Sequence, residues 1–409
     1  MGCTSFKSIK ALDICSGDFH LENKDYTKAV ECYKQVLLIL VKNQKQPTEE
    51  LLEKISTCLE CSASNQEALN FYISLKKDCK SPSNKVQGSN PSETLSFITE
   101  KIAESYFKDS QYEEAIIYLE ELKQDYIKVC NKPNEKIRKL ENRVALSHKY
   151  LGNFNKALEI YDKILKSQEL ELEKTTDLSI IYGNIACCYF SLGKSDLSLE
   201  FLEKSLKTKQ SQKNTNLAGT HINFAVVHFN QGNIDKALES LKTAETECSN
   251  HGILLAKIYN SQAACFIKLG RFIDAEKTIK KYQVINKVHL NKMSKIHLAS
   301  FFNNLIVYFY KTGKIEDLEK GFKYFVETHQ GVKQGSFLFR QYFITSGLFF
   351  YYKKKFTQAL EEMLKAEELQ NKYLGPAHMS IPTHLNNIGA LYMILGDQEK
   401  ADFYFNKSL

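Results

Sequence analysis

Residue types that could perform metal or covalent chemistry are sparse in this chain. Cys58 and Cys61 form a C-x-x-C pair, but a structural zinc site needs four ligands, usually supplied by a second close pair. No second pair follows, and both cysteines fall in a segment with helical spacing, where small buried residues are expected. We find no paired carboxylates, glycine-rich phosphate loop or nucleophile–base arrangement. The sequence therefore predicts no metal, no cofactor and no enzymatic activity.

The N-terminal residues match a pattern for covalent attachment of fatty acids. Gly2 and Cys3 match the start of doubly acylated proteins, with glycine for myristate and cysteine for palmitate. Phe6 stands where that motif has serine or threonine, although Lys7 and Lys10 would favour an anionic membrane. Two hypotheses remain open, an acylated terminus and an ordinary frayed one.

A repeating pattern of small and apolar residues runs along the chain. Small or apolar residues return at intervals of 38 to 47 residues, at Ala29, Ala68, Ala115, Ala157, Ser198, Ala237, Ala275, Leu318, Ala359 and Ala401. Within residues 182–205, apolar side chains at i, i+3, i+4 and i+7 predict one helix, and Gly193 can take the positive φ that ends it. A second helix follows, with Ser198 and Leu202 on one face. The period indicates stacked helical hairpins, none of which can bury its apolar face alone.

The spacing of small, glycine and aromatic residues matches a known repeat signature at Gly17, Ala29, Tyr33, Ala103, Tyr106, Tyr112, Ala115, Ala145, Gly152, Phe154, Ala157 and Tyr161. At these positions the chain resembles the tetratricopeptide repeat (TPR) family. Its long period and its final unit, residues 374–392, resemble the kinesin light chain class. The resemblance implies an all-α fold, a right-handed α-solenoid (superhelix) of about ten TPR-like hairpins.

One segment interrupts the repeats. Residues 81–92 are polar and rich in Pro, Gly and Ser, which predicts a flexible loop. It would separate two divergent repeats in residues 1–80 from a main array of repeats 3–10 in residues 93–409. The sequence stops at Leu409 inside the last second helix, with no polar cap. Because solenoid ends usually need a cap, we expect a partner, a further segment or self-association at that end.

A row of polar residues marks a candidate binding surface. In repeats of this family the first helices line a concave groove. One register of those helices holds mostly asparagine, and the position before it often holds asparagine as well. An amide donates to and accepts from a peptide backbone at once, so one amide per repeat suits an extended chain of any sequence. The candidate residues are Arg143, Asn184, Asn223, Asn260, Asn303, Asn304, Asn386 and Asn387. The alternative is that these asparagines bond neighbouring helices or face water.

A row of apolar residues lies one turn further along the same helices, at Phe190, Phe229, Ile267, Tyr310, Tyr351 and Met393. Such side chains could offer pockets for alternate side chains of a ligand, or they could pack between repeats. Lys149, Lys268 and Lys311 lie at or beside this row and give it a basic lining. Glu53 and Glu100 occupy comparable sites in the N-terminal repeats, which predicts a groove with an acidic and a basic end.

The composition of the chain limits which classes of partner and which compartment are expected. The net charge of +7 comes almost entirely from lysine, whereas nucleic-acid surfaces usually rely on arginine, so we predict no nucleic acid. Eleven cysteines without a secretory signal favour a reducing compartment. No stretch reaches the ~18 apolar residues that span a bilayer. We predict a cytoplasmic protein, with cytoskeletal association or a lipid tether as further options.

Together these patterns predict a non-enzymatic scaffold or adaptor that binds an extended segment of another protein in the concave groove of repeats 5–10. One alternative is a structural subunit of a large assembly, for example cytoskeletal or ciliary, held by its convex face and its ends. Another is an adaptor attached to a membrane through an acylated N-terminus.

Overall fold

The computed structural model describes residues 6–42, 49–62, 65–79, 93–109, 111–129, 135–169, 178–212, 217–248, 251–289, 295–328, 337–373 and 380–408. These residues form twenty α-helices and contain no strand. The predicted all-α fold of about ten hairpins is therefore confirmed. The predicted loop at 81–92, the acylation residues Gly2 and Cys3, and the terminal Leu409 lie outside the described residues.

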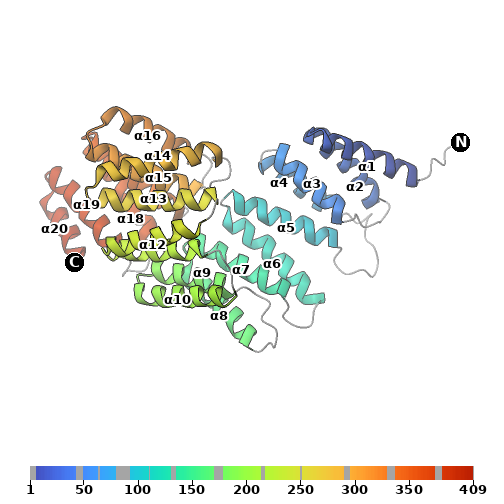
Figure 1. Cartoon of the computed structure of the whole chain (residues 1–409), viewed down its shortest axis with the longest axis horizontal. Helices are drawn as coiled ribbons and strands as arrows, with labels where there is room; N and C mark the ends of the chain where they lie inside the picture. The colour runs from blue at the N-terminus through green and yellow to red at the C-terminus, as the bar shows by residue number, and fades with distance from the viewer. Residues whose placement is uncertain are drawn as a thin grey trace. The chain divides into compact units, whose positions relative to one another are not determined.

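Each hairpin pairs a first helix with a second helix (Figure 1). The first helices are α1 (Phe6–Glu22), α3 (Glu49–Ser62), α5 (Glu93–Lys108), α7 (Glu135–Tyr150), α9 (Leu178–Ser191), α11 (Ala218–Asn230), α13 (Gly252–Lys268), α15 (Lys295–Lys311), α17 (Phe337–Tyr352) and α19 (Ser380–Ile394). The second helices are α2 (Tyr26–Lys42), α4 (Asn65–Cys79), α6 (Tyr112–Val129), α8 (Phe154–Glu169), α10 (Ser195–Ser211), α12 (Ile234–Glu247), α14 (Phe272–His289), α16 (Ile315–Thr328), α18 (Phe356–Tyr373) and α20 (Gln398–Lys407).

The turn within the hairpins reverses the chain through a left-handed residue. Gly193 has φ of 77°, and the next amide, of Lys194, returns to the carbonyl of Tyr189 at 2.9 Å. Six turns use glycine in this conformation, while Lys24 and Lys354 take it in the first and ninth hairpins with φ of 58° and 57°. A side chain is strained there, which explains why glycine is usual at this position.

Small residues let the paired helices approach closely. Ala186, Ala237 and Ala401 are fully buried at the crossings. Gly389 packs so tightly that a Cβ there would lie 2.7 Å from the ring of Phe405. Consecutive hairpins are joined by aromatic packing as well, as where Tyr282 of α14 stacks on Phe301 of α15 with ring centroids 3.7 Å apart. The core therefore runs from one hairpin into the next.

Two compact units divide the chain, unit 1 at Met1–Ser147 and unit 2 at His148–Leu409. In unit 2, successive first helices lie against one another, from α9 through α11, α13 and α15 to α17, while successive second helices approach less closely. A stack curves toward its closer layer, so the first helices line the concave side of unit 2. The predicted division at residues 81–92 stays a prediction.

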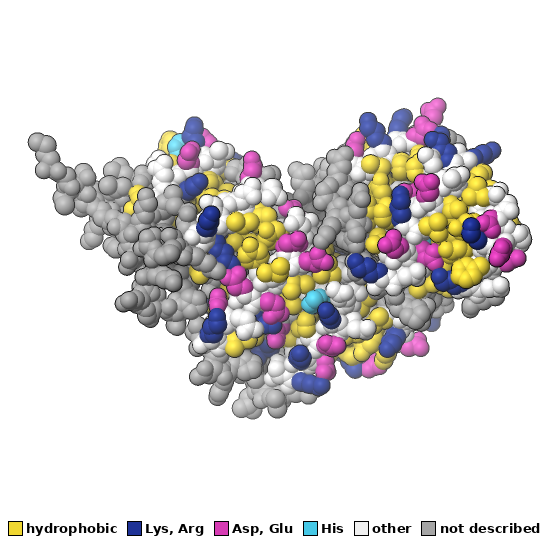
Figure 2. All heavy atoms as spheres, turned by 180° about the vertical axis from the view of Figure 1, so that it is seen from behind, with side chains coloured by type: hydrophobic (Ala, Val, Ile, Leu, Met, Phe, Trp, Pro, Cys, Tyr) yellow, Lys and Arg dark blue, Asp and Glu magenta, His cyan; other side chains and the backbone are white. Residues whose placement is uncertain are grey.

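The surface carries charges of both signs. Figure 2 shows Lys and Arg side chains interspersed with Asp and Glu on one face, with hydrophobic patches between them. Within the described residues, no helix is both long enough and apolar enough to cross a membrane.

Candidate functional site

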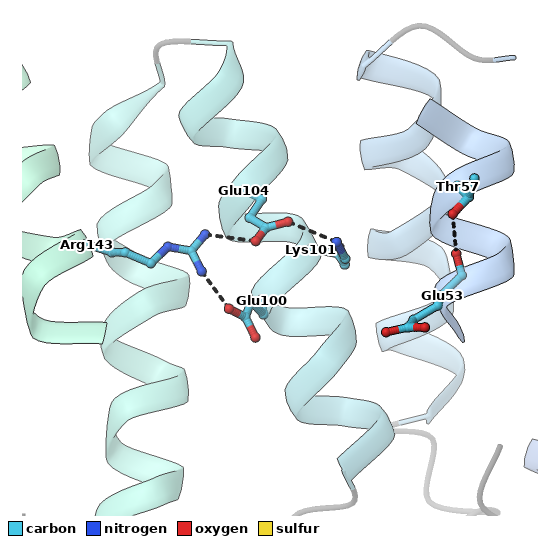
Figure 3. A network of polar contacts seen from close by, with 6 residues as sticks. All are labelled: Glu53, Thr57, Glu100, Lys101, Glu104 and Arg143. Carbon is cyan, nitrogen blue, oxygen red and sulfur yellow. Dashed lines mark hydrogen bonds and ion pairs between the residues drawn. The ribbon is translucent and has the colours of Figure 1, made fainter. Parts of the chain in front are cut away.

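In unit 1, the first helices carry a balanced network of charges. Arg143 of α7 reaches Glu100 of α5 at 2.7 Å and Glu104 at 3.4 Å. Lys101 donates to the other oxygen of Glu104 at 3.2 Å, and Glu53 of α3 lies apart from these ion pairs (Figure 3). Arg143, predicted as a peptide-binding residue, is thus already neutralised by two carboxylates.

In unit 2 the amide row begins at Asn184 of α9. Its Oδ1 accepts a hydrogen bond from the ammonium of Lys149 in α7 at 2.9 Å. The Lys149 ammonium also lies 5.1 Å from the ring centroid of Tyr150. Asn184 is therefore held by a cation that has no carboxylate partner among the described residues.

Further along, the amides form a ladder between helices. Asn304 of α15 donates to Oδ1 of Asn260 at 2.8 Å, and Asn260 donates to Ser300 at 3.1 Å. Thr345 of α17 donates to Oδ1 of Asn303 at 2.8 Å. The alternative of bonding to neighbouring helices thus describes Asn260, Asn303 and Asn304. Their own bonds fix these amides along the concave side.

The other members of the row are more open. Asn223 and Asn387 are half-buried, and neither bonds to another residue that the structure describes. Asn386 is exposed and accepts from Ser408 at 2.8 Å. Asn223 and Asn387 are therefore the amides whose full bonding capacity is available to a ligand.

The apolar row is partly used for packing. Ile267 is buried, and Phe190 packs against a buried cluster formed by Ala186, Leu202 and Val227. Tyr310 of α15 stacks on Tyr352 of α17 with centroids 3.5 Å apart. Phe229 lies 4.7 Å below the ammonium of Lys268. Packing between hairpins thus accounts for much of this row. Tyr351 is half-buried, Met393 is exposed, and Tyr310 is exposed beside its stacked partner.

One polar residue of the concave side was missed by the sequence reasoning. Lys257 of α13 is half-buried, and it has neither a hydrogen-bond partner nor an ion pair among the described residues. Its pKa is lowered, first by burial and then by the positive charge of Lys149. Lys149 and Lys257 are far apart in sequence, and the curvature of unit 2 brings them close enough for their charges to interact. The available signal was a lone charge in the apolar sequence GILLAKIY.

The eighth hairpin contains an apolar cavity of about 640 Å³ beside α15 and α16. Phe302, Leu305, Phe309 and Tyr324 line it. Leu318 stands in this hairpin where most others have a small residue at the helix crossing.

No group of three or more His, Cys, Asp or Glu side chains in the described ranges is arranged to hold a metal ion. Cys58 is buried and Cys61 is exposed. His228 lies near Phe224 with its ring almost parallel, at 6.4 Å between centroids. Cys58 is thus part of the buried core, and His228 packs against Phe224.

Comparison with protein families decides the identity of the repeat. Models of the tetratricopeptide repeat match residues 136–211, residues 16–39 and 385–409, and residues 101–126. The chain is a tetratricopeptide repeat protein. The kinesin-light-chain-like subclass stays a prediction.

One curated TPR protein resembles the chain in sequence, and solved structures resemble it in fold, all at low identity. TPR repeat-containing protein MJ1428 of Methanocaldococcus jannaschii is 24% identical over 309 residues, which is 68% of this chain and 51% of the relative, so the chain spans about half the length of that curated protein. A Rap protein complexed with Competence and Sporulation Factor has a TM-score of 0.56 at 13% identity, covering 98% of this chain and 96% of that chain. The Rap conjugation gene regulator of plasmid pLS20, in complex with the Phr* peptide, has a TM-score of 0.53 at 11% identity, covering 98% and 94%. At these identities the likeness is one of fold.

Proposed function

We propose that this TPR protein is a non-enzymatic scaffold that binds an extended peptide segment of another protein along the concave side of unit 2. The observation that carries the proposal is the amide row on successive first helices. Asn184, Asn260 and Asn304 are fixed by bonds to neighbouring side chains, and the amides of Asn223 and Asn387 make no bonds to described residues. Amides that recur at a regular interval can form hydrogen bonds with the backbone N–H and C=O groups of an extended chain.

Two further observations support a peptide as the ligand. Exposed apolar side chains, Tyr310 and Met393, accompany the amides and could contact alternate side chains of the ligand. The two Rap proteins with the same fold are described in complexes with a factor and with a peptide. Those ligands belong to those proteins, and they favour a peptide-sized occupant here.

The proposal can be tested with a display library of random 16-residue peptides, panned against the full chain. The affinity of enriched peptides is then measured by fluorescence anisotropy for wild type and for Asn223→Ala/Asn387→Ala. These two amides make no bonds to described residues, so the variant should keep its helicity. Loss of two neutral hydrogen bonds should weaken binding about tenfold.

The matched control is Gln210→Ala/Gln358→Ala, which removes two exposed amides from second helices. It should bind like wild type. Failure to enrich any peptide, or equal affinity of the Asn223→Ala/Asn387→Ala variant and wild type, would contradict binding through the amide row.

A further inference from the structure

The charges of unit 2 are segregated between its two layers of helices. None of the first helices α9, α11, α13, α15, α17 and α19 contains an Asp or Glu. Each of the second helices α10, α12, α14, α16, α18 and α20 contains at least two. Burial alone does not require this pattern, because asparagine, serine and lysine do occur on the first helices.

Several lysines on the second helices have carboxylate partners, whereas Lys236 and Lys242 have none among the described residues. On the second helices, Lys204 pairs with Glu200 at 2.6 Å, Lys280 with Glu276 at 2.8 Å and Lys407 with Glu367 at 2.8 Å. On the first helices, none of the following has a carboxylate partner among the described residues: Lys149, Lys257, Lys268 and Lys311. The concave side of unit 2 thus presents cations without counter-charges.

The most confined of these cations form a pair across the concave side. Lys149 lies in the last turn of α7, and Lys257 lies in α13, three hairpins further along. Even so, the charge of Lys149 contributes to the lowered pKa of Lys257. Asn184 binds Lys149, which holds its ammonium on the concave side. A partly desolvated ammonium without a counter-ion is unfavourable, and an incoming anion removes this penalty. The arrangement is therefore complementary to negative charge.

We infer that the segment bound by unit 2 is acidic, with side-chain carboxylates seated between Lys149 and Lys257 and extending toward Lys268 and Lys311. This inference rests on the proposed peptide function and specifies its ligand class. Cations spread over α7, α13 and α15 match several carboxylates along a chain better than a single terminal one. An amide row and lysine, rather than stacking arginine, favour an acidic peptide over a nucleic acid.

The unbiased test uses the same random library. Peptides enriched on wild type should carry net negative charge, and replacing their Asp and Glu by Asn and Gln should weaken binding at least tenfold. Lys149→Gln/Lys257→Gln should weaken binding of the acidic peptide to a similar degree. Lys236→Gln/Lys242→Gln, which removes the same charge from exposed positions of α12, should not.

Several outcomes would overturn the inference. Enriched peptides that are neutral or basic, but still depend on Asn223, would leave peptide binding intact and refute an acidic ligand. If amidation of the peptide's C-terminus alone abolished binding, the lysines would bind a terminal carboxylate rather than side-chain carboxylates. Displacement of the peptide by a 16-nucleotide poly-uridylate at lower concentration than by the acidic peptide itself would favour nucleic acid. If no peptide is enriched, the proposed function fails and this inference fails with it.

Discussion

At the scale of the residue, Lys257 lowers the stability of the folded state. Burial and the charge of Lys149 lower its pKa, so the folded state disfavours its protonated form relative to the unfolded chain. This penalty is present at neutral pH and fades as the pH rises through the lowered pKa. A buried cation of this kind is a candidate for a contact with a ligand.

Replacing Lys257 should therefore separate stability from binding. Lys257→Met keeps the length of the side chain and removes its charge, so we expect the midpoint of thermal unfolding to rise by on the order of 2 °C. The same variant should bind the acidic peptide more weakly. Circular dichroism melts and fluorescence anisotropy measure the two effects. A lower midpoint would show that the ammonium has a stabilising partner.

His384 of α19 gives unit 2 a dependence on pH. It is 2% exposed, its Nε2 lies 3.0 Å from the carbonyl of Met363, and burial lowers its pKa to about 4. Because the folded pKa lies below the unfolded value of about 6.5, the contribution of neutral His384 is kept above pH 6.5 and lost as the pH falls toward 4.

We expect local stability around α18 and α19 to fall by up to roughly 3 kcal/mol between pH 7 and pH 4 because of this group. His384→Asn should remove that part of the pH dependence, whereas replacement of the exposed His251 should not. Hydrogen exchange of the α18 and α19 amides, corrected for intrinsic rates, reports the difference. An unchanged pH profile in His384→Asn would assign the acid sensitivity to other groups.

At the scale of the element, a hairpin depends on how closely its two helices cross. Gly389 of α19 lies under Phe405 of α20, with no room for a Cβ. Gly219, near the start of α11, has nothing within 4 Å of the place where a Cβ would be. The same residue type thus has a packing role in one helix and none in the other.

The two glycines predict opposite effects of one substitution. Gly389→Ala should destabilise the last hairpin by about 1–3 kcal/mol through overpacking. Gly219→Ala should be neutral or stabilise by up to about 1 kcal/mol, because alanine favours the helix. Thermal unfolding followed by circular dichroism compares both with wild type. Equal effects would mean that helix propensity, rather than the crossing, governs Gly389.

At the scale of the whole molecule, the two units differ in the charge of their first helices. In unit 1, α1, α3 and α5 each contain at least three carboxylates, and Arg143 is already paired. In unit 2, the first helices α9, α11, α13, α15, α17 and α19 contain none. An acidic segment should therefore bind to unit 2 and be repelled by the first helices of unit 1.

Hydrogen exchange with and without the acidic peptide tests this assignment. Binding should slow exchange in α9, α11 and α13 and leave α1 to α6 unchanged, because only the former surround Lys149 and Lys257. Raising the salt concentration should weaken the effect, since screening reduces attraction between exposed charges. Protection of α3 and α5 instead would place the ligand on the acidic helices.

The sequence by itself determined the hairpins and most of their internal contacts. Spacing of 3.6 residues per turn and recurring small residues at Ala237 and Ala401 specify the hairpins, because these patterns act between residues close in sequence. The glycine at Gly193 fixed the turn for the same reason, and its positive φ is observed. The TPR family could be named from these positions alone.

Only the tertiary structure decided which polar groups have partners. The sequence placed Asn184, Asn304 and Asn223 in one row, but bonding to Lys149 and Asn260 distinguishes the first two from the third. It placed Lys149 in the basic lining and overlooked Lys257. Hydrogen bonds and charge interactions depend on distances of a few ångströms between residues far apart in sequence, and the curvature of the stacked helices sets those distances.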